Sequence, residues 1–239
     1  MPFRGPLLLQ GLAVAAAADL ILLALMPRIL QWHSVAVGML LRMASVPWQT
    51  GLAITVFPGI SAALPRTQYL DYAAHPLYPI LCTGLTLTCF LAAFRYLPAP
   101  LKPLLLLVPA SLAMTFLFFR FISPAAPYSP EAFCAIWYRG ETYLWLLLPL
   151  IFTMSFFVLN VPFSLKIRWL AFMQGYAFLW SAVRLAFALA TFHYFGSIWM
   201  PLFYFAFGFL ADFLYIVATY SLAMDRAAIF LARQKEVWQ

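Results

Sequence analysis

Three side chains that lie far apart in the sequence have the types needed for chemistry on a carbonyl group. Cys134 lies in the polar patch EAFCAIWYRGE, residues 131–141, between two long apolar runs. Arg184 follows it by fifty residues, and Tyr204 follows Arg184 by twenty. A cysteine attacks a carbonyl as its thiolate, and a nearby guanidinium favours that anion and stabilises the oxyanion that forms. The sequence therefore presents Cys134 as a candidate nucleophile and Arg184 as its electrostatic partner.

The composition indicates which solvent surrounds these residues. Of the 239 residues, 66% are hydrophobic and 9% are charged, whereas a soluble domain carries about a quarter charged residues. The 14 lysines and arginines behind the formal net charge of +7 are scattered between apolar segments. They therefore indicate membrane topology and not nucleic-acid binding. The composition predicts an integral membrane protein whose single transmembrane domain covers 1–239.

Apolar stretches of about 20 residues, long enough to cross the hydrocarbon as a helix, predict the membrane spans. We expect an all-α integral membrane protein, a polytopic helical bundle of six to eight transmembrane helices, because the stretches are too evenly apolar for barrel strands. The segment 34–64 is apolar but broken by polar residues and prolines, and it predicts a short crossing, a re-entrant turn or an interfacial helix. The clear candidate spans are 6–27, 76–97, 101–120, 142–162, 168–193 and 197–224.

Basic residues at the ends of the spans predict the orientation in the membrane. The tail after Met224 holds three of them, so the C-terminus is expected on the cytoplasmic side of the inner (cytoplasmic) membrane. The basic turns at 95–102 and 166–168 then fall on the same side. The patch that contains Cys134 falls on the outer face. The side of the N-terminus stays open, because the course of 34–64 is open.

The predicted spans place the candidate residues at similar depths. Arg184 lies nine residues, about 13 Å, below the outer end of its span, and an arginine at that depth indicates a functional site. Tyr204 lies about two turns into the next span, and Asp212 shares its face. We expect Cys134, Arg184 and Tyr204 to meet near the outer face. The alternative is a structural pair between Arg184 and Asp212, in a buried cluster with Tyr204.

A general acid must protonate the leaving amine in such a reaction. Histidine does this well near neutral pH, whereas the phenol of Tyr204 donates a hydrogen bond but is a poor base. His193 points away from Arg184 on a continuous helix, so we expect it at the outer interface, bonded to lipid headgroups or to a loop carbonyl. His75, on the outer side, is the better substitute, and His33 falls in the ambiguous region and indicates little.

The sequence around these residues resembles that of a known family. The stretch LKIRWLAFMQGYAFLWSAVRLAFALATFHYFGS, followed by FYFAFG, is similar to the exosortase and archaeosortase family of membrane-embedded cysteine transpeptidases. In that family a cysteine just outside a span precedes an arginine in an N-x-x-R motif, and a histidine in an H-x-x-x-G motif follows. Here Ser181-Ala-Val-Arg184 corresponds to the first motif and Tyr204-Phe-Ala-Phe-Gly208 to the second. The similarity covers roughly 128–215.

The resemblance implies an activity and a partner. An active member recognises an exported protein with a C-terminal transmembrane sorting signal, cuts it near the outer face through a thioester on Cys134, and passes the acyl group to an acceptor. The catalytic residues would be Cys134, Arg184 and Tyr204. No motif for a cofactor or a metal occurs in the sequence, so none is expected. Membrane lipids and a partner subunit of a membrane complex are the other expected contacts, and nucleic acid is not.

Two other classes of function fit the same residues. Because Tyr204 stands where the family has histidine, the chain is also interpreted as a non-catalytic membrane subunit or scaffold that holds a partner protein, lipid or pigment. A small transporter is the third interpretation. It depends on Asp19, Asp212 and Arg184 as charges inside the spans.

Overall fold

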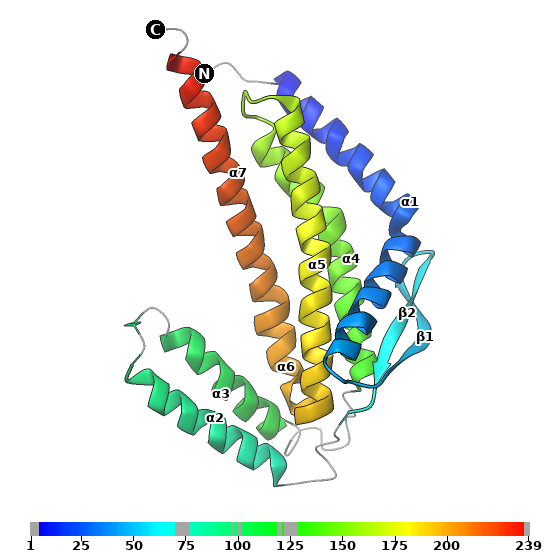
Figure 1. The fold of residues 1–239 in the computed structure, drawn as a ribbon, viewed down its shortest axis with the longest axis vertical. Coiled ribbons are helices and arrows are strands. Elements are labelled where there is room, and N and C mark those ends of the chain that lie inside the picture. The colour runs from blue at the N-terminus through cyan, green and yellow to red at the C-terminus, as the bar shows by residue number, and fades with distance from the viewer. Residues whose placement is uncertain are drawn as a thin grey trace.

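The fold is described here from a computed structural model, which covers residues 5–69, 77–96, 98–99, 102–118, 121 and 129–236. This part of the chain is mostly helical and contains one small antiparallel sheet. The start of the first helix and the end of the last lie at the same end of the bundle (Figure 1). The long helices are α1 (Gly5–Met43), α4 (Pro130–Phe156), α5 (Phe163–Phe195) and α7 (Ala211–Glu236).

Helix α1 continues well past the predicted span 6–27. Its 39 residues correspond to about 58 Å at 1.5 Å per residue. Figure 1 shows the helix changing direction part-way along, and Pro27 lies inside it. A proline there removes a backbone hydrogen bond and kinks a helix. The apolar residues beyond the kink therefore remain helical and turn back along the bundle.

The segment 34–64 contains the one sheet of the described chain, so the all-α prediction is wrong here. Its first ten residues complete α1, and the strands β1 (Trp48–Phe57) and β2 (Ile60–Thr67) follow as a hairpin. β-Branched and aromatic residues before the turn favour a strand. The turn is made by Pro58 and Gly59, and Gly59 has a φ of 79°, which glycine adopts without strain.

The hairpin packs on α1 and α4 along the lower half of the bundle (Figure 1). The side chain of Arg139 in α4 donates from Nε to the carbonyl of Thr55 at 3.3 Å. The ring of Trp48 lies so close to α1 that a Cβ on Gly38 would be 2.2 Å from it. A glycine at position 38 is therefore needed for the hairpin to dock.

Three segments of the described residues are long and apolar enough to cross a membrane, so the prediction of six to eight spans is not met. Helix α4 has 27 residues, but it carries Glu131, Arg139 and Glu141 in its first half. Helices α2 and α3 have 17 and 16 residues, fewer than the roughly 20 that a crossing needs. The three segments are Pro6–Met43, Phe163–Phe195 and Ser197–Ala232. The two short helices are α2 (Tyr78–Phe94) and α3 (Lys102–Leu117).

The last of these segments does not begin as a regular α-helix. A 3₁₀ turn, η4 (Ser197–Trp199), and a single helical turn, α6 (Met200–Leu202), lead into a π-helix, η5 (Phe203–Leu210). α7 continues from it. π-Helical turns are rare and frequently mark functional sites. This one ends beside the buried arginine of α5.

The core lies where α1, α4 and α5 pack together. Phe133 of α4 and Phe192 of α5 meet edge to face with ring centroids 4.9 Å apart, and Phe152 stacks on Phe156 at the same distance. Lys166 is buried near the start of α5, where its Nζ donates to the carbonyl of Phe157 at 2.7 Å. The pairing of α4 with α5 is therefore fixed at both ends.

Candidate functional site

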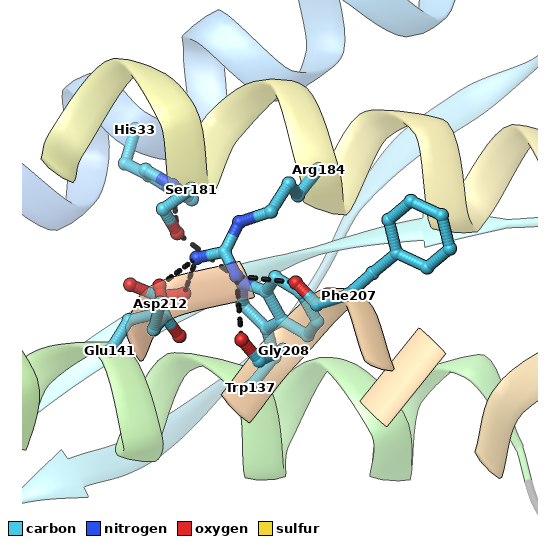
Figure 2. Close-up of polar contacts among 8 residues, drawn as sticks. All are labelled: His33, Trp137, Glu141, Ser181, Arg184, Phe207, Gly208 and Asp212. Carbon is cyan, nitrogen blue, oxygen red and sulfur yellow. Dashed lines mark hydrogen bonds and ion pairs between the residues drawn. The ribbon is translucent and has the colours of Figure 1, made fainter. Parts of the chain in front are cut away.

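Arg184 is held by four oxygen atoms from three neighbouring elements, α4, η5 and α7. Its side chain is 2% exposed, and Nη2 donates to Oε1 of Glu141 at 2.7 Å and to the carboxylate of Asp212. Nη1 donates to the carbonyl of Gly208 at 2.9 Å and to that of Phe207 (Figure 2). The predicted pairing of Arg184 with Asp212 is confirmed. Glu141 is a second partner that the sequence did not indicate.

The π-helix η5, which precedes α7, supplies the two carbonyl groups. Phe207 and Gly208 lie in the last part of the π-helix, just before the bonding pattern changes from i→i+5 to i→i+4. Both carbonyl oxygens accept from Arg184. The side chain of Arg184 therefore ties α5 to η5 through these two carbonyl groups and to α7 through Asp212.

Two tryptophans flank the guanidinium of Arg184. Its Cζ lies 5.1 Å from the ring centroid of Trp137 and 5.9 Å from that of Trp180. Attraction of a cation to an aromatic face is strongest where water is absent. The site therefore stabilises a positive charge in an otherwise apolar interior.

A buried polar chain of residues adjoins the arginine. His33 of α1 is buried, and its Nδ1 lies 3.1 Å from the hydroxyl of Tyr138. Its Nε2 lies 3.2 Å from Oγ of Ser181, and these two side chains are drawn in Figure 2. The indole Nε1 of Trp137 donates to the same Oγ at 3.3 Å. The sequence indicates little about a role for His33, because this residue borders the broken segment 34–64. The structure places it inside the continuous helix α1, beyond the end of the predicted span 6–27, where the sequence does not mark it as an ionisable group within a span.

Glu141, Arg184 and Asp212, hereafter the Arg184 cluster, contain two carboxyl groups and one guanidinium. Glu141 is 5% exposed, and its Oε2 is buried without a hydrogen-bond partner. With both acids ionised the formal charge of the cluster is −1. A buried carboxylate oxygen without a donor is unfavourable, so the cluster can accept a further proton or donor group.

A groove of about 510 Å³ runs between α4 and the η5–α7 segment beside this cluster. We call it the α4–α7 groove. Most of its lining is apolar, including Phe209, whose side chain is 80% exposed. Glu141 and Asp212 are the two acids in the lining, and Gly140 and Gly208 also line it. The Arg184 cluster is therefore reached through an apolar groove.

Cys134 is packed as a core residue. Its side chain is fully buried, and Sγ donates to the carbonyl of Pro65 in β2 at 3.7 Å. A thiol in buried surroundings of this kind resists ionisation. Within the described chain, the hydrogen-bond and ion-pair partners of Arg184 do not include Cys134. The geometry thus shows the thiol covered by the hairpin and not paired with the guanidinium.

Tyr204, the third candidate catalytic residue, is partly exposed in η5. Its side chain is 41% exposed and lines the α4–α7 groove together with a pocket of about 420 Å³ that η5 forms with α3 and α4. The structure brings together Arg184 and Gly208 of the two motifs, but gives Tyr204 no polar contact with Cys134 or Arg184. The catalytic roles of Cys134, Arg184 and Tyr204 stay predictions.

The other titratable candidates have separate places. His193 bonds through Nδ1 to the carbonyl of Gln68 at 2.8 Å, which confirms the loop carbonyl as its partner. Asp19 lies in α1, and its Oδ1 is buried without a hydrogen-bond partner. His75 lies outside the described residues.

A second, more polar cavity lies at the base of the hairpin. It has a volume of about 590 Å³ and is lined by the strand ends, residues 47–49 and 66–69, and by Glu131 of α4. Arg66 and Glu131 form an ion pair across it at 2.8 Å. We call it the hairpin cavity. It adjoins the first turn of α4, in which Glu131 precedes Cys134 by three residues.

Comparison with known proteins gives no match. No family model, no curated protein and no solved structure matches this chain. The resemblance to the exosortase and archaeosortase family therefore depends on the quoted residues alone, and the functional argument depends on the geometry of the site.

Proposed function

We propose that this membrane protein binds a transmembrane segment of another protein in the α4–α7 groove. The observation that carries the proposal is the presence of two acids, Glu141 and Asp212, in the lining of an open, otherwise apolar groove. A helix surface that only faces lipid has no use for carboxyl groups, which are unfavourable in hydrocarbon. A groove that combines apolar walls with polar groups is typical of a binding site.

The shape of the groove suits a helix. Gly140 and Gly208 lie in its lining, and a Cβ added at Gly140 would meet nothing within 4 Å. Small residues at helix interfaces in membranes let two backbones approach closely. The aromatic side chains of η5 and α7 supply the contact area on the other wall. This corresponds to the interpretation of the chain as a membrane subunit that holds a partner protein.

The placement in the membrane is part of the proposal. The three apolar segments are compatible with a membrane protein, and α4 runs antiparallel to α5 inside the same bundle (Figure 1). We therefore take α4 as a further crossing, with its acids turned to Arg184. The basic tail after Met224 then faces the cytoplasm, and the hairpin faces the outer side.

The second candidate function is the cysteine transpeptidase that the exosortase and archaeosortase resemblance implies. The hairpin cavity favours it, because Glu131 lines this polar cavity and precedes Cys134 by three residues in α4. For catalysis the hairpin would have to leave Cys134, whose thiol is covered by β2. The α4–α7 groove would then hold the sorting helix, and the hairpin cavity would hold the extended residues outside the membrane.

Site-specific photo-crosslinking tests the main proposal. A benzoylphenylalanine at Phe209 samples the groove, and one at Leu20, which is 68% exposed on α1, samples a lipid-facing surface. We expect adducts at position 209, and not at position 20, whose fragments map to transmembrane segments of a defined protein. Gly140→Leu should fill the groove and remove them. Adducts that are equal at both positions, or that persist in Gly140→Leu, would contradict the proposal.

A covalent intermediate on Cys134 would separate the second candidate function from the first. A transpeptidase would also accumulate a thioester between Cys134 and its substrate, which hydroxylamine cleaves and which Cys134→Ala cannot form. Crosslinking at position 209 without any hydroxylamine-sensitive species supports binding alone. A species that disappears in Cys134→Ala supports the transpeptidase.

A further inference from the structure

We infer that the transmembrane segment held in the α4–α7 groove carries a lysine or arginine, which pairs with Glu141 beside Arg184. This inference rests on the proposed function and specifies the chemistry of the partner. It concerns a single atom, Oε2 of Glu141, and the charge of the cluster around it.

With both acids ionised, the Arg184 cluster carries a formal charge of −1, which a cation would neutralise. Oε1 of Glu141 and the carboxylate of Asp212 share one guanidinium nitrogen, Nη2 of Arg184. Oε2 of Glu141 is buried and has no hydrogen-bond partner. One positive charge therefore serves two acids, and one more positive charge would make the cluster neutral.

The described cations on α4, α5 and α7 do not supply that charge. The first basic residue of α7, Arg226, lies fourteen residues, about 21 Å, beyond Asp212, and those of α4 and α5 have partners elsewhere. The side chain of Arg139 donates to the carbonyl of Thr55, Lys166 donates to that of Phe157, and Arg168 donates to that of Ser164. His33 is bonded to Tyr138 and Ser181. A cation that reaches Glu141 through the groove therefore comes from outside the described chain.

Glu141 and Asp212 both line the α4–α7 groove. Figure 2 shows Glu141 and Asp212 together at one end of the guanidinium, with the two carbonyl groups at the other end. Gly140, where an added Cβ would meet nothing within 4 Å, leaves room beside Glu141 for a long basic side chain. A charge pair in apolar surroundings is favourable only when its geometry is good and its hydrogen bonds are complete. The pair would therefore select a helix with a basic residue at this depth over an uncharged one.

The test uses the purified full-length protein in phosphatidylcholine nanodiscs with two synthetic poly-leucine transmembrane peptides of about 20 residues. One peptide has a lysine at its centre and the other has leucine, and energy transfer between labelled protein and peptide reports binding. We expect the lysine peptide to bind about tenfold more tightly. Glu141→Gln should reduce its binding to that of the leucine peptide, whereas Asp19→Asn, which changes an acid on α1, should leave it unchanged.

The controls keep the inference falsifiable. If Glu141→Gln does not fold, Asp212→Asn tests the same charge, because it also makes the cluster neutral, and it should remove the preference. Equal binding of the two peptides, or a preference that survives both substitutions, would overturn the inference. If adducts at position 209 persist while the lysine preference is absent, only the inference fails. If both are absent, the proposed function fails with it.

Discussion

The Arg184 cluster and the surroundings of Cys134 share one face of α4 but are built in opposite ways. Seven residues separate Cys134 from Glu141, about 10 Å along the helix. Glu141 belongs to a network of charges and hydrogen bonds from α4, α5 and η5–α7. Cys134 contacts one backbone carbonyl of the hairpin and is otherwise packed in the core.

The difference between these two regions shows which groups the positive charge of Arg184 stabilises. A reactive thiol needs electropositive, partly exposed surroundings. In this fold the guanidinium is occupied by two carboxyl groups and two carbonyl groups, and the thiol lies under β2. In this arrangement the guanidinium is paired with groups other than the thiol, and a reaction at Cys134 would require motion of the hairpin.

The largest effect is expected for Arg184→Leu. Its removal leaves Glu141 and Asp212 buried without a cation, and breaking a buried charge pair from one side costs about 3–5 kcal/mol. Thermal unfolding in detergent should show a large loss of stability. Arg168→Ala is the matched control on the same helix, because Arg168 is exposed. Equal midpoints for the two variants would show that the cluster does not hold the fold together.

The next effect concerns the hairpin that covers Cys134. Gly38→Ala places a methyl group 2.2 Å from the ring of Trp48, and overpacking of this kind costs about 1–3 kcal/mol. The hairpin should loosen from α1, and a maleimide should then label Cys134 faster in a variant that lacks the other two cysteines. Gly175→Ala, where a Cβ meets nothing within 4 Å, should not accelerate labelling. Unchanged labelling in both would mean that the hairpin is not what protects the thiol.

Cys134 itself should behave as a small apolar side chain. In the native protein we expect its reaction with a maleimide to be slower than that of a free thiol at pH 7, and fast only after unfolding. Cys134→Ala should reduce stability by about 1 kcal/mol, as for loss of a small buried group. If Cys134 instead reacts faster than a free thiol, and Arg184→Lys slows that reaction, the thiol is an activated nucleophile. Cys134, and not only the Arg184 cluster, would then depend on the charge of Arg184.

The smallest effect is expected for the ion pair at the hairpin cavity. Arg66 and Glu131 are 2.8 Å apart but largely accessible to solvent, and exposed ion pairs contribute about 0–1 kcal/mol. Arg66→Ala, Glu131→Ala and the double variant form a cycle that isolates the pair energy. A coupling well above this range, measured by denaturant unfolding, would show that the cavity is drier than its exposure indicates.

Part of this site could be predicted from the sequence. The low content of charged residues indicates a membrane protein, and an arginine inside an apolar run indicates a buried partner. Asp212 follows in the next long apolar segment, so the pairing of Arg184 with Asp212 could be anticipated. These inferences succeed because they depend on charge and on helical spacing alone.

Glu141 and the hairpin were missed for different physical reasons. The predicted spans 101–120 and 142–162 leave the acids and the arginine of residues 131–141 outside the membrane helices. Ser129 followed by Pro130 nevertheless marks a helix start, and Oγ of Ser129 does accept from the backbone N of Ala132. That start places Glu141 inside α4. The hairpin has apolar residues on both sides of its strands, so the alternation that marks a half-buried strand is absent.

The π-helical turn before α7 has a consequence for how this site could be lost or gained. A π-helical turn holds about one residue more than an α-helical turn, so deletion of one residue within Phe203–Leu210 would let this segment return to ordinary α-helical bonding with α7 only slightly rotated. Asp212 would still face Arg184, whereas the carbonyl groups of Phe207 and Gly208 would leave the irregular bonding pattern from which they accept the hydrogen bonds of the guanidinium. A single codon deletion could thus separate the ion pair of the cluster from its backbone contacts.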